Sequence, residues 1–181
     1  MLYLLLANGF EEVEALGTVD FLRRCGLNVL MGSITGRRMV TGTHQIPVMA
    51  DCLLRHSNIG NSDGIILPGG MPGAENLRKN NTVERSVRTL FDTNKLVAAI
   101  CAAPMVLGHC GILNGRNATC YPGFETWLHG ANVCKEQNVV EDGNIITARG
   151  PAFTFQFAAA IARRFVNEDV VNQVTQGMLF Q

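Results

Sequence analysis

The sequence has no excess of charge of either sign and few charged residues of any kind. Fifteen lysines and arginines balance fifteen aspartates and glutamates, and charged residues make up 17% of the chain. Proteins that attract nucleic acid or anionic membrane surfaces through long-range electrostatics need a basic excess. We therefore expect neither a nucleic acid nor a membrane as a partner.

Long hydrophobic runs are also missing. The apolar stretch at residues 1–7 is far shorter than the ~20 residues that span a bilayer, and no basic residue precedes it as in a signal peptide. This stretch instead predicts a buried strand.

Paired cysteines are absent, although cysteine itself is not. The chain has no Cys-x-x-Cys pair and no Cys/His cluster, so nothing indicates a structural zinc site. We expect no metal and no cofactor, and without a signal peptide we expect a cytoplasmic protein with reduced thiols. The six cysteines are Cys25, Cys52, Cys101, Cys110, Cys120 and Cys134.

What the sequence does contain is an alternation of apolar strands and helices. Its 181 residues suffice for one substantial core, so we expect a single domain over residues 1–181. The alternation is typical of an α/β fold with a mostly parallel central sheet and helices on both faces. Strands are predicted at 2–7, 27–34, 65–67 and 96–100, helices at 11–25, 81–93, 152–166 and 168–176, a short helix and its exit at 51–61, an antiparallel excursion at 37–50 and a β-hairpin at 139–148.

The stretch Leu96-Val-Ala-Ala-Ile-Cys101-Ala-Ala-Pro104 places a cysteine where a strand turns into a helix. Such an elbow is a position for a nucleophile, and the N–H groups at the start of the next helix favour a thiolate, which lowers the thiol pKa. A strand-end cysteine can equally well serve only for packing. The stretch by itself leaves both interpretations open.

Glu14 falls on the inward stripe of the first helix. Phe10, Glu14, Gly17 and Phe21 follow one another at helical spacing, whereas Glu11 and Glu12 are expected to face water as charges of the first turn. A carboxyl group on an inward stripe needs a partner or a raised pKa. The alternative is that the side chain bends to the edge of the helix.

A glycine-rich loop follows the strand at 65–67. Its sequence, Pro68-Gly-Gly-Met-Pro-Gly-Ala-Glu-Asn76, matches neither a dinucleotide fingerprint nor a phosphate-binding P-loop. Gly69 and Gly70 can present N–H groups to an oxyanion, or the loop is a tight turn without a ligand. Because the carboxyl ends of parallel strands meet at one edge, Glu14, these glycines and Cys101 are expected to lie close together.

Four segments in this order resemble the ThiJ/PfpI superfamily, and most of all the branch that contains the human parkinsonism-linked protein and its small bacterial relatives. They are Gly9-Phe-Glu-Glu-Val-Glu14, Leu67-Pro-Gly-Gly-Met-Pro-Gly-Ala-Glu-Asn-Leu77, Ala99-Ile-Cys101-Ala-Ala-Pro104 and Thr147-Ala-Arg-Gly-Pro151. The resemblance implies a flavodoxin-like three-layer sandwich and a homodimer. It also implies an easily oxidised nucleophile at Cys101, a protonated Glu14 touching it, and backbone donors at Gly70 and Ala102.

The chain also departs from this superfamily's pattern. Ala102 stands where protease-like branches carry histidine, so a Cys–His pair of that type is absent. Tyr121 stands where this branch often has a histidine near the cysteine, and His44 is expected where some relatives have an arginine that reaches over it. Cys120 is a candidate second thiol or a packed cysteine. Arg149 and Pro151, in the last of the four segments, are further candidate neighbours of the site.

Two functions from different classes follow. The first is a cysteine-dependent enzyme, of glyoxalase or deglycase type, that acts on reactive dicarbonyls such as methylglyoxal or on their glycated adducts. In it Glu14 moves the proton, and the N–H groups of Gly70 and Ala102 hold the oxyanion. The second is a non-catalytic oxidative-stress sensor or chaperone in which Cys101 is oxidised to a sulfinate that Glu14 stabilises.

Overall fold

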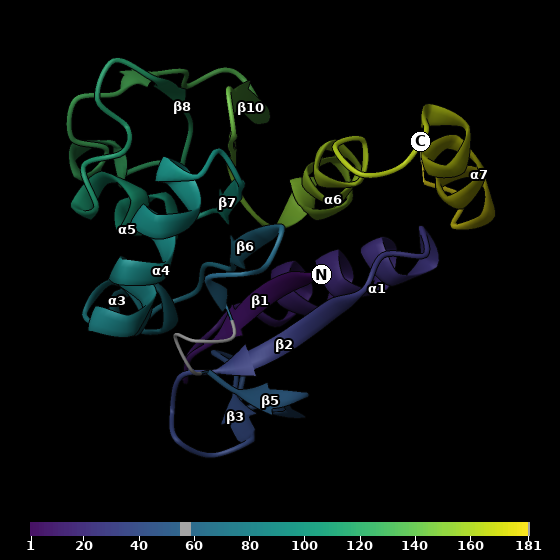
Figure 1. Ribbon diagram of the computed structural model, residues 1–181, viewed down its shortest axis with the longest axis horizontal. Coiled ribbons are helices and arrows are strands. Elements are labelled where there is room, and N and C mark those ends of the chain that lie inside the picture. Colours follow the sequence, from purple (N-terminus) through teal and green to yellow (C-terminus); the bar gives the residue numbers. More distant parts are fainter. Residues whose placement is uncertain (55–58, 181) are drawn as a thin grey trace.

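A seven-stranded sheet forms the middle of the molecule (Figure 1). The computed structural model describes residues 1–54 and 59–180. The strand order is β10-β11-β7-β6-β1-β2-β5, and all neighbours pair in parallel except the antiparallel hairpin β10–β11. The strands are β1 (Leu2–Leu6), β2 (Val29–Ser33), β5 (Cys52–Leu53), β6 (Gly64–Leu67), β7 (Leu96–Ile100), β10 (Val139–Asp142) and β11 (Ile145–Ala148).

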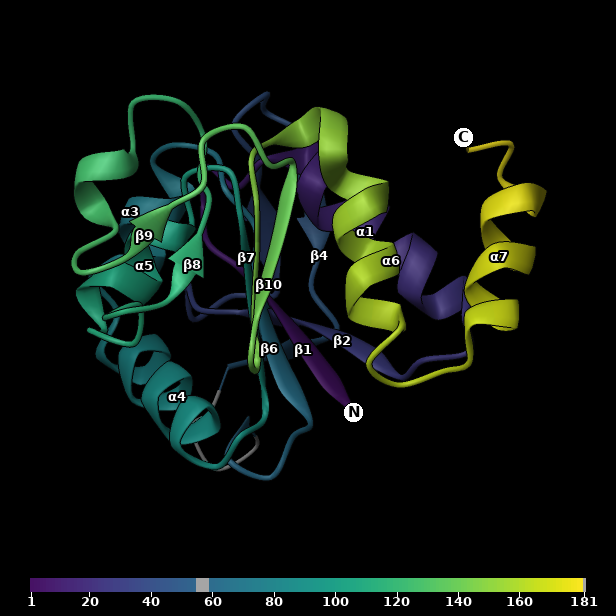
Figure 2. The same ribbon diagram turned by 90° about the horizontal axis from the view of Figure 1, so that it is seen from above.

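Helices cover both faces of this sheet, which gives three layers (Figure 2). One face carries α1 (Glu12–Arg24), α6 (Thr154–Ala162) and α7 (Glu168–Gly177). The other carries α3 (Gly73–Arg78), α4 (Asn81–Asp92) and α5 (Pro104–His109). The predicted α/β architecture is confirmed. None of the helices in the described part of the chain has the length and apolar character needed to cross a membrane.

Short strands and 3₁₀ turns lie outside the seven-stranded sheet. The antiparallel pair β3 (Met39–Thr41) and β4 (Pro47–Met49) forms the predicted excursion as a small sheet of its own, and β8 (Asn117–Ala118) pairs in parallel with β9 (Asn132–Val133). Two 3₁₀ turns, η1 (Glu125–Trp127) and η2 (Pro151–Phe153), complete the fold.

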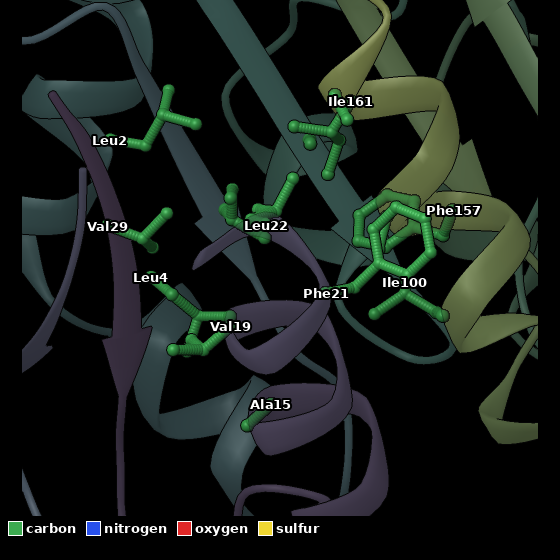
Figure 3. Close-up of a cluster of buried hydrophobic side chains, with 14 of the residues drawn as sticks. Leu2, Leu4, Ala15, Val19, Phe21, Leu22, Val29, Ile100, Phe157 and Ile161 are labelled. Atoms are coloured by element: carbon green, nitrogen blue, oxygen red, sulfur yellow. The ribbon is translucent and has the colours of Figure 1, made fainter. Parts of the chain in front are cut away.

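Apolar packing between α1, α6 and the sheet fixes the position of α1 (Figure 3). Phe21 and Phe157 are fully buried beside Ile100, the last residue of β7. Glu11 caps the helix because its carboxylate accepts the N–H of Glu14 at 2.7 Å. The first turn of α1 is therefore held against the carboxyl ends of the strands, where the loops of a parallel sheet meet.

Two predicted boundaries are wrong. The short helix expected at 51–61 is replaced at its start by strand β5, because Cys52 and Leu53 pair with the open edge of β2, opposite Gly32 and Ser33. The part of that prediction at 55–58 lies outside the described residues. The helix expected at 152–166 begins as the 3₁₀ turn η2 and continues as α6 only to Ala162, beyond which the chain closes in tighter turns.

Candidate active site

Cys101 occupies a sharp turn between β7 and α5. Its φ of 64° lies in the left-handed region, which a non-glycine residue adopts only when its surroundings hold it there. Here the Cys101 N–H donates to the carbonyl of Ala148 at 2.8 Å, and the Cys101 carbonyl accepts the N–H of Tyr121 at 2.8 Å. Pro104 is the first residue of the helix that follows, where it needs no hydrogen-bond acceptor. Hydrogen bonds to the N–H and to the carbonyl of Cys101 therefore hold the turn in place.

The Glu14 side chain extends from α1 toward the Cys101 turn and is fully buried. One carboxylate oxygen, Oε2, accepts the N–H of Gly69 at 2.8 Å. The other, Oε1, has no hydrogen-bond partner of ordinary geometry among the described residues. The carboxyl group as a whole interacts with the thiol of Cys101, which is 8% exposed. The structure therefore brings the predicted cysteine and carboxyl group together.

The two side chains change each other's ionisation. Burial raises the pKa of Glu14 to about 7, although the interactions with the Cys101 thiol and the Gly69 N–H lower it. Burial also raises the pKa of the Cys101 thiol, an ionised Glu14 raises it further, and the N–H groups of Gly70 and Ala102 act against both. The sequence-based expectation of a depressed cysteine pKa is wrong in direction, because burial beside a carboxylate outweighs the helix start.

The glycines of the loop after β6 are needed for close approach. A Cβ atom on Gly69 would lie 2.7 Å from the Cβ of Cys101 and 2.8 Å from Oε2 of Glu14. Gly70 has a φ of +82°, and a Cβ there would lie 2.5 Å from the backbone nitrogen of Glu11. The N–H of Gly69 is engaged by Glu14, so it is not available to an oxyanion, contrary to one reading of the loop. The N–H groups of Gly70 and Ala102 face the cysteine sulfur instead.

His44 lies on the β3–β4 loop and contacts Glu12. Its backbone N–H donates to Oε1 of Glu12 at 2.7 Å, and its ring Nδ1 lies 2.7 Å from Oε2. This hydrogen bond raises the pKa of His44. Glu11 and Glu12 are 9% and 5% exposed, so the expectation that both face water is wrong: one caps the helix and the other anchors the hairpin. No described contact joins His44 to Cys101.

The remaining predicted neighbours lie on the other side of the elbow. Tyr121, Arg149 and Pro151 line an open hollow of about 260 Å³. Cys120 is 4% exposed and packs in the core beneath α3, α4 and α5, whereas Cys101 belongs to the core beneath α1 and α6. Burial raises the pKa of Cys120 to about 12. Of its two interpretations, the structure supports the packed cysteine.

Two contacts of the site have no signal in the sequence. The carbonyl of Ala148 and the N–H of Tyr121 fix the elbow through backbone atoms, which any residue type supplies. The pairing of Glu12 with His44 joins residues 32 positions apart through the docking of a hairpin.

A cysteine at a strand-to-helix elbow of a parallel sheet, in contact with a buried carboxyl group, defines an α/β protein of the nucleophile-elbow class. The chain belongs to the DJ-1/PfpI family, whose family model matches residues 1–164. The predicted resemblance to the ThiJ/PfpI superfamily is thereby confirmed.

Curated relatives cover nearly the whole chain. It is 33% identical to protein dj-1beta of Drosophila melanogaster over 176 residues, which is 97% of this chain and 94% of the relative. It is 33% identical to the Parkinson disease protein 7 homologue of Danio rerio over 180 residues, 98% of this chain and 95% of that protein. A protein of Pyrococcus horikoshii named a deglycase is 36% identical over 149 residues, 82% of this chain and 89% of the relative.

The three-dimensional structure agrees with these sequence comparisons. The crystal structure of Drosophila melanogaster DJ-1beta superimposes with a TM-score of 0.94 at 31% identity, covering 99% of this chain and 97% of that one. The sequence comparisons thus show the family, and the structural comparison shows the fold.

Proposed function

We propose that the chain is a cysteine-dependent enzyme that acts on reactive dicarbonyls such as methylglyoxal, or on their adducts with amines and thiols. The single observation that carries this proposal is the contact between the Cys101 thiol and the buried Glu14 carboxyl group. A carboxyl group with a pKa of about 7 can both accept and return a proton near neutral pH. Relatives that are named deglycases support the same reaction class.

The first step forms a hemithioacetal. Glu14 accepts the thiol proton, and the sulfur of Cys101 attacks the aldehyde carbon of methylglyoxal, so that a C–S bond forms and the carbonyl π electrons move to oxygen. Glu14 then returns its proton to that oxygen. The N–H groups of Gly70 and Ala102 stabilise the sulfur anion before the attack.

The second step rearranges the bound substrate. Glu14 removes the proton from the aldehyde-derived carbon and delivers it to the neighbouring ketone-derived carbon, while the proton of the hemithioacetal hydroxyl moves to the ketone oxygen. The first carbon is thereby oxidised to a thioester and the second is reduced to an alcohol. Water then cleaves the C–S bond, releases lactate and restores the thiol. The net reaction is methylglyoxal plus water to lactate, and for an amine adduct the C–N bond breaks as well, which frees the amine. These steps use no metal and no organic cofactor.

The test compares the wild-type chain with its Cys101→Ala variant during incubation with methylglyoxal. We expect the wild type to form one lactate per methylglyoxal consumed, and the Cys101→Ala variant to match the protein-free blank. Cys134→Ala, which removes a partly exposed cysteine elsewhere, is the matched control and should retain wild-type activity. Equal consumption by the wild type and the Cys101→Ala variant would contradict the proposal.

The same proteins decide for or against the second candidate, a sensor without turnover. Its supporting observation is that three donors, the N–H groups of Gly70 and Ala102 and a protonated Glu14, surround the sulfur and could bind sulfinate oxygens. If no methylglyoxal is consumed, and mass spectrometry after mild peroxide treatment shows two added oxygens on Cys101 before any other cysteine, the sensor replaces the enzyme.

We also propose that two copies of the chain pair. Four apolar side chains are about half exposed on the start of α1 and on the hairpin that docks against it: Val13, Met39, Ile46 and Met49. Burying these side chains against a second copy would remove their apolar surface from water. Sedimentation that gives only a 19.7 kDa species at all concentrations would rule the pair out.

A further inference from the structure

Arg149 is a half-buried cation that forms no ion pair with a described acid, although its charge acts on Glu125 at longer range. Its guanidinium forms neither an ion pair nor a hydrogen bond with any residue of the ranges 1–54 and 59–180. By contrast, Arg23 and Arg116 each face a carboxylate, at 2.6 and 2.8 Å. A guanidinium offers five N–H donors in a planar fork, so Arg149 has its full donor set left for a ligand.

The position of Arg149 links it to the elbow. It lines both the hollow of about 260 Å³ beside Tyr121 and a smaller one of about 190 Å³, and Pro122 is the other residue that the two hollows share. Arg149 directly follows Ala148, whose carbonyl accepts the Cys101 N–H, and Pro122 directly follows Tyr121, whose N–H donates to the Cys101 carbonyl. Each shared residue therefore directly follows a residue whose backbone is hydrogen-bonded to Cys101.

The smaller hollow contains further groups that suit an anion. Lys135 lines it and forms no ion pair within the described part of the chain. Thr119 lines it too, 1% exposed, and its hydroxyl has no described hydrogen-bond partner. Glu125 and Glu136 are the acids of the lining, and Glu125 is held by the N–H of Gly123 at 2.8 Å, not by either cation.

The charges of the two cations reach the neighbouring groups. Backbone hydrogen bonds lower the pKa of Glu125, and Lys135 and Arg149 lower it further. Arg149 and Lys135 also oppose the rise that burial and Glu125 impose on the pKa of Cys120. Both cations therefore act electrostatically on Glu125 and Cys120, two groups in the lining of the smaller hollow.

We propose that Arg149, assisted by Lys135, binds a carboxylate carried by the substrate that reacts at Cys101. Bidentate pairing with a guanidinium is among the strongest hydrogen-bonded contacts that side chains offer a carboxylate. The preferred substrate class is then a dicarbonyl adduct of a small amino acid or of a mercapto carboxylic acid, not the free neutral dicarbonyl. This assignment refines the proposed function and rests on it for the identity of the reaction.

The first test needs no turnover. Iodoacetate and iodoacetamide alkylate the same sulfur with loss of iodide and differ in the negative charge, so the ratio of their rates at Cys101 reports an anion site nearby. The ratio is measured by mass spectrometry of the Cys101 peptide. We expect Arg149→Met to lower the iodoacetate-to-iodoacetamide ratio about tenfold, the effect of one lost charge-assisted hydrogen bond, with the iodoacetamide rate unchanged.

Two further variants keep this test decisive. Arg85→Met removes a cation from the exposed face of α4, where the side chain donates a hydrogen bond to the Asn81 carbonyl and forms no ion pair with a described residue, and should leave the ratio unchanged. Lys135→Met, at an exposed position, should lower it about threefold. An unchanged ratio in Arg149→Met overturns the anion site. If Arg149→Met fails to fold, an unchanged ratio in Lys135→Met overturns it instead. An equal fall in the rates of both reagents also overturns it, because such a fall marks a purely structural role.

The second test uses turnover. Methylglyoxal forms hemithioacetals with 3-mercaptopropionate and with 2-mercaptoethanol, of which only the first carries a carboxylate. We expect Arg149→Met to lower kcat/KM about tenfold for the first adduct and to leave the second unchanged. A wild-type chain that consumes neither adduct contradicts the proposed function while the alkylation ratio still decides the anion site. A wild-type chain that consumes both, with no selective loss in Arg149→Met, contradicts the anion site alone.

Discussion

Replacement of Glu14 by glutamine is expected to lower kcat/KM for methylglyoxal by about 10²–10⁴, the contribution of a positioned general acid–base group. Glutamine has nearly the same shape, and its carbonyl oxygen can accept the N–H of Gly69 that Oε2 of Glu14 accepts at 2.8 Å. It cannot take the thiol proton or return it to the substrate. The loss should therefore appear in kcat as well as in kcat/KM, measured by initial rates of methylglyoxal consumption.

The matched control is Glu12→Gln. Glu12 lies on the same first turn of α1 and is also buried, but its carboxylate contacts His44. We expect this variant to retain activity within a few-fold of the wild type. Equal losses in Glu12→Gln and Glu14→Gln would assign the effect to the packing of α1 and contradict a proton-transfer role for Glu14.

Glu14→Gln is also expected to make the folded chain more stable than the wild type above pH 7. The pKa of Glu14 is raised from 4.5 to about 7, so the folded state binds the proton more tightly than the unfolded state does. The stabilisation from this group is complete below pH 4.5 and is lost as the pH rises to about 7. At pH 8 the wild type has lost about 3 kcal/mol that the glutamine variant keeps.

Urea unfolding of both proteins at pH 5 and pH 8 measures this difference. The free energies of unfolding should differ by less than about 1 kcal/mol at pH 5 and by about 3 kcal/mol in favour of the variant at pH 8. Glu12→Gln should not show this gain. If the difference in the free energy of unfolding between the two proteins is the same at pH 5 and pH 8, Glu14 titrates at its ordinary pKa.

The sequence predicts the fold best where the signal is local. The strands that begin at Leu2 and Leu96 are continuous apolar runs, and each is buried along its length. Strand β5 is different, because Cys52 and Leu53 become a strand only by pairing with the free edge of β2. A two-residue pairing of this kind depends on what the rest of the chain leaves open, and no periodicity reports it.

The same division applies to the candidate site. The inward position of Glu14 follows from its spacing with Phe10 and Phe21, and the elbow at Cys101 follows from a strand that ends beside Pro104. The pKa direction of Cys101 does not follow, since it depends on burial and on a carboxylate 87 positions earlier in the chain. Likewise, the engagement of the Gly69 N–H by Glu14 requires two loops to have docked.

The central claim is that Cys101 and Glu14 share one proton, which makes the cysteine reactive when Glu14 carries it. The rate of Cys101 alkylation by iodoacetamide between pH 5 and pH 10, in the wild type and in Glu14→Gln, tests this claim most directly. In the wild type the rate should rise through a pH of about 7, where the pair loses its first proton, and then level off. In Glu14→Gln the step near pH 7 should vanish, leaving a single rise at the pKa of an isolated buried thiol. Superimposable profiles for the two proteins would contradict the shared proton.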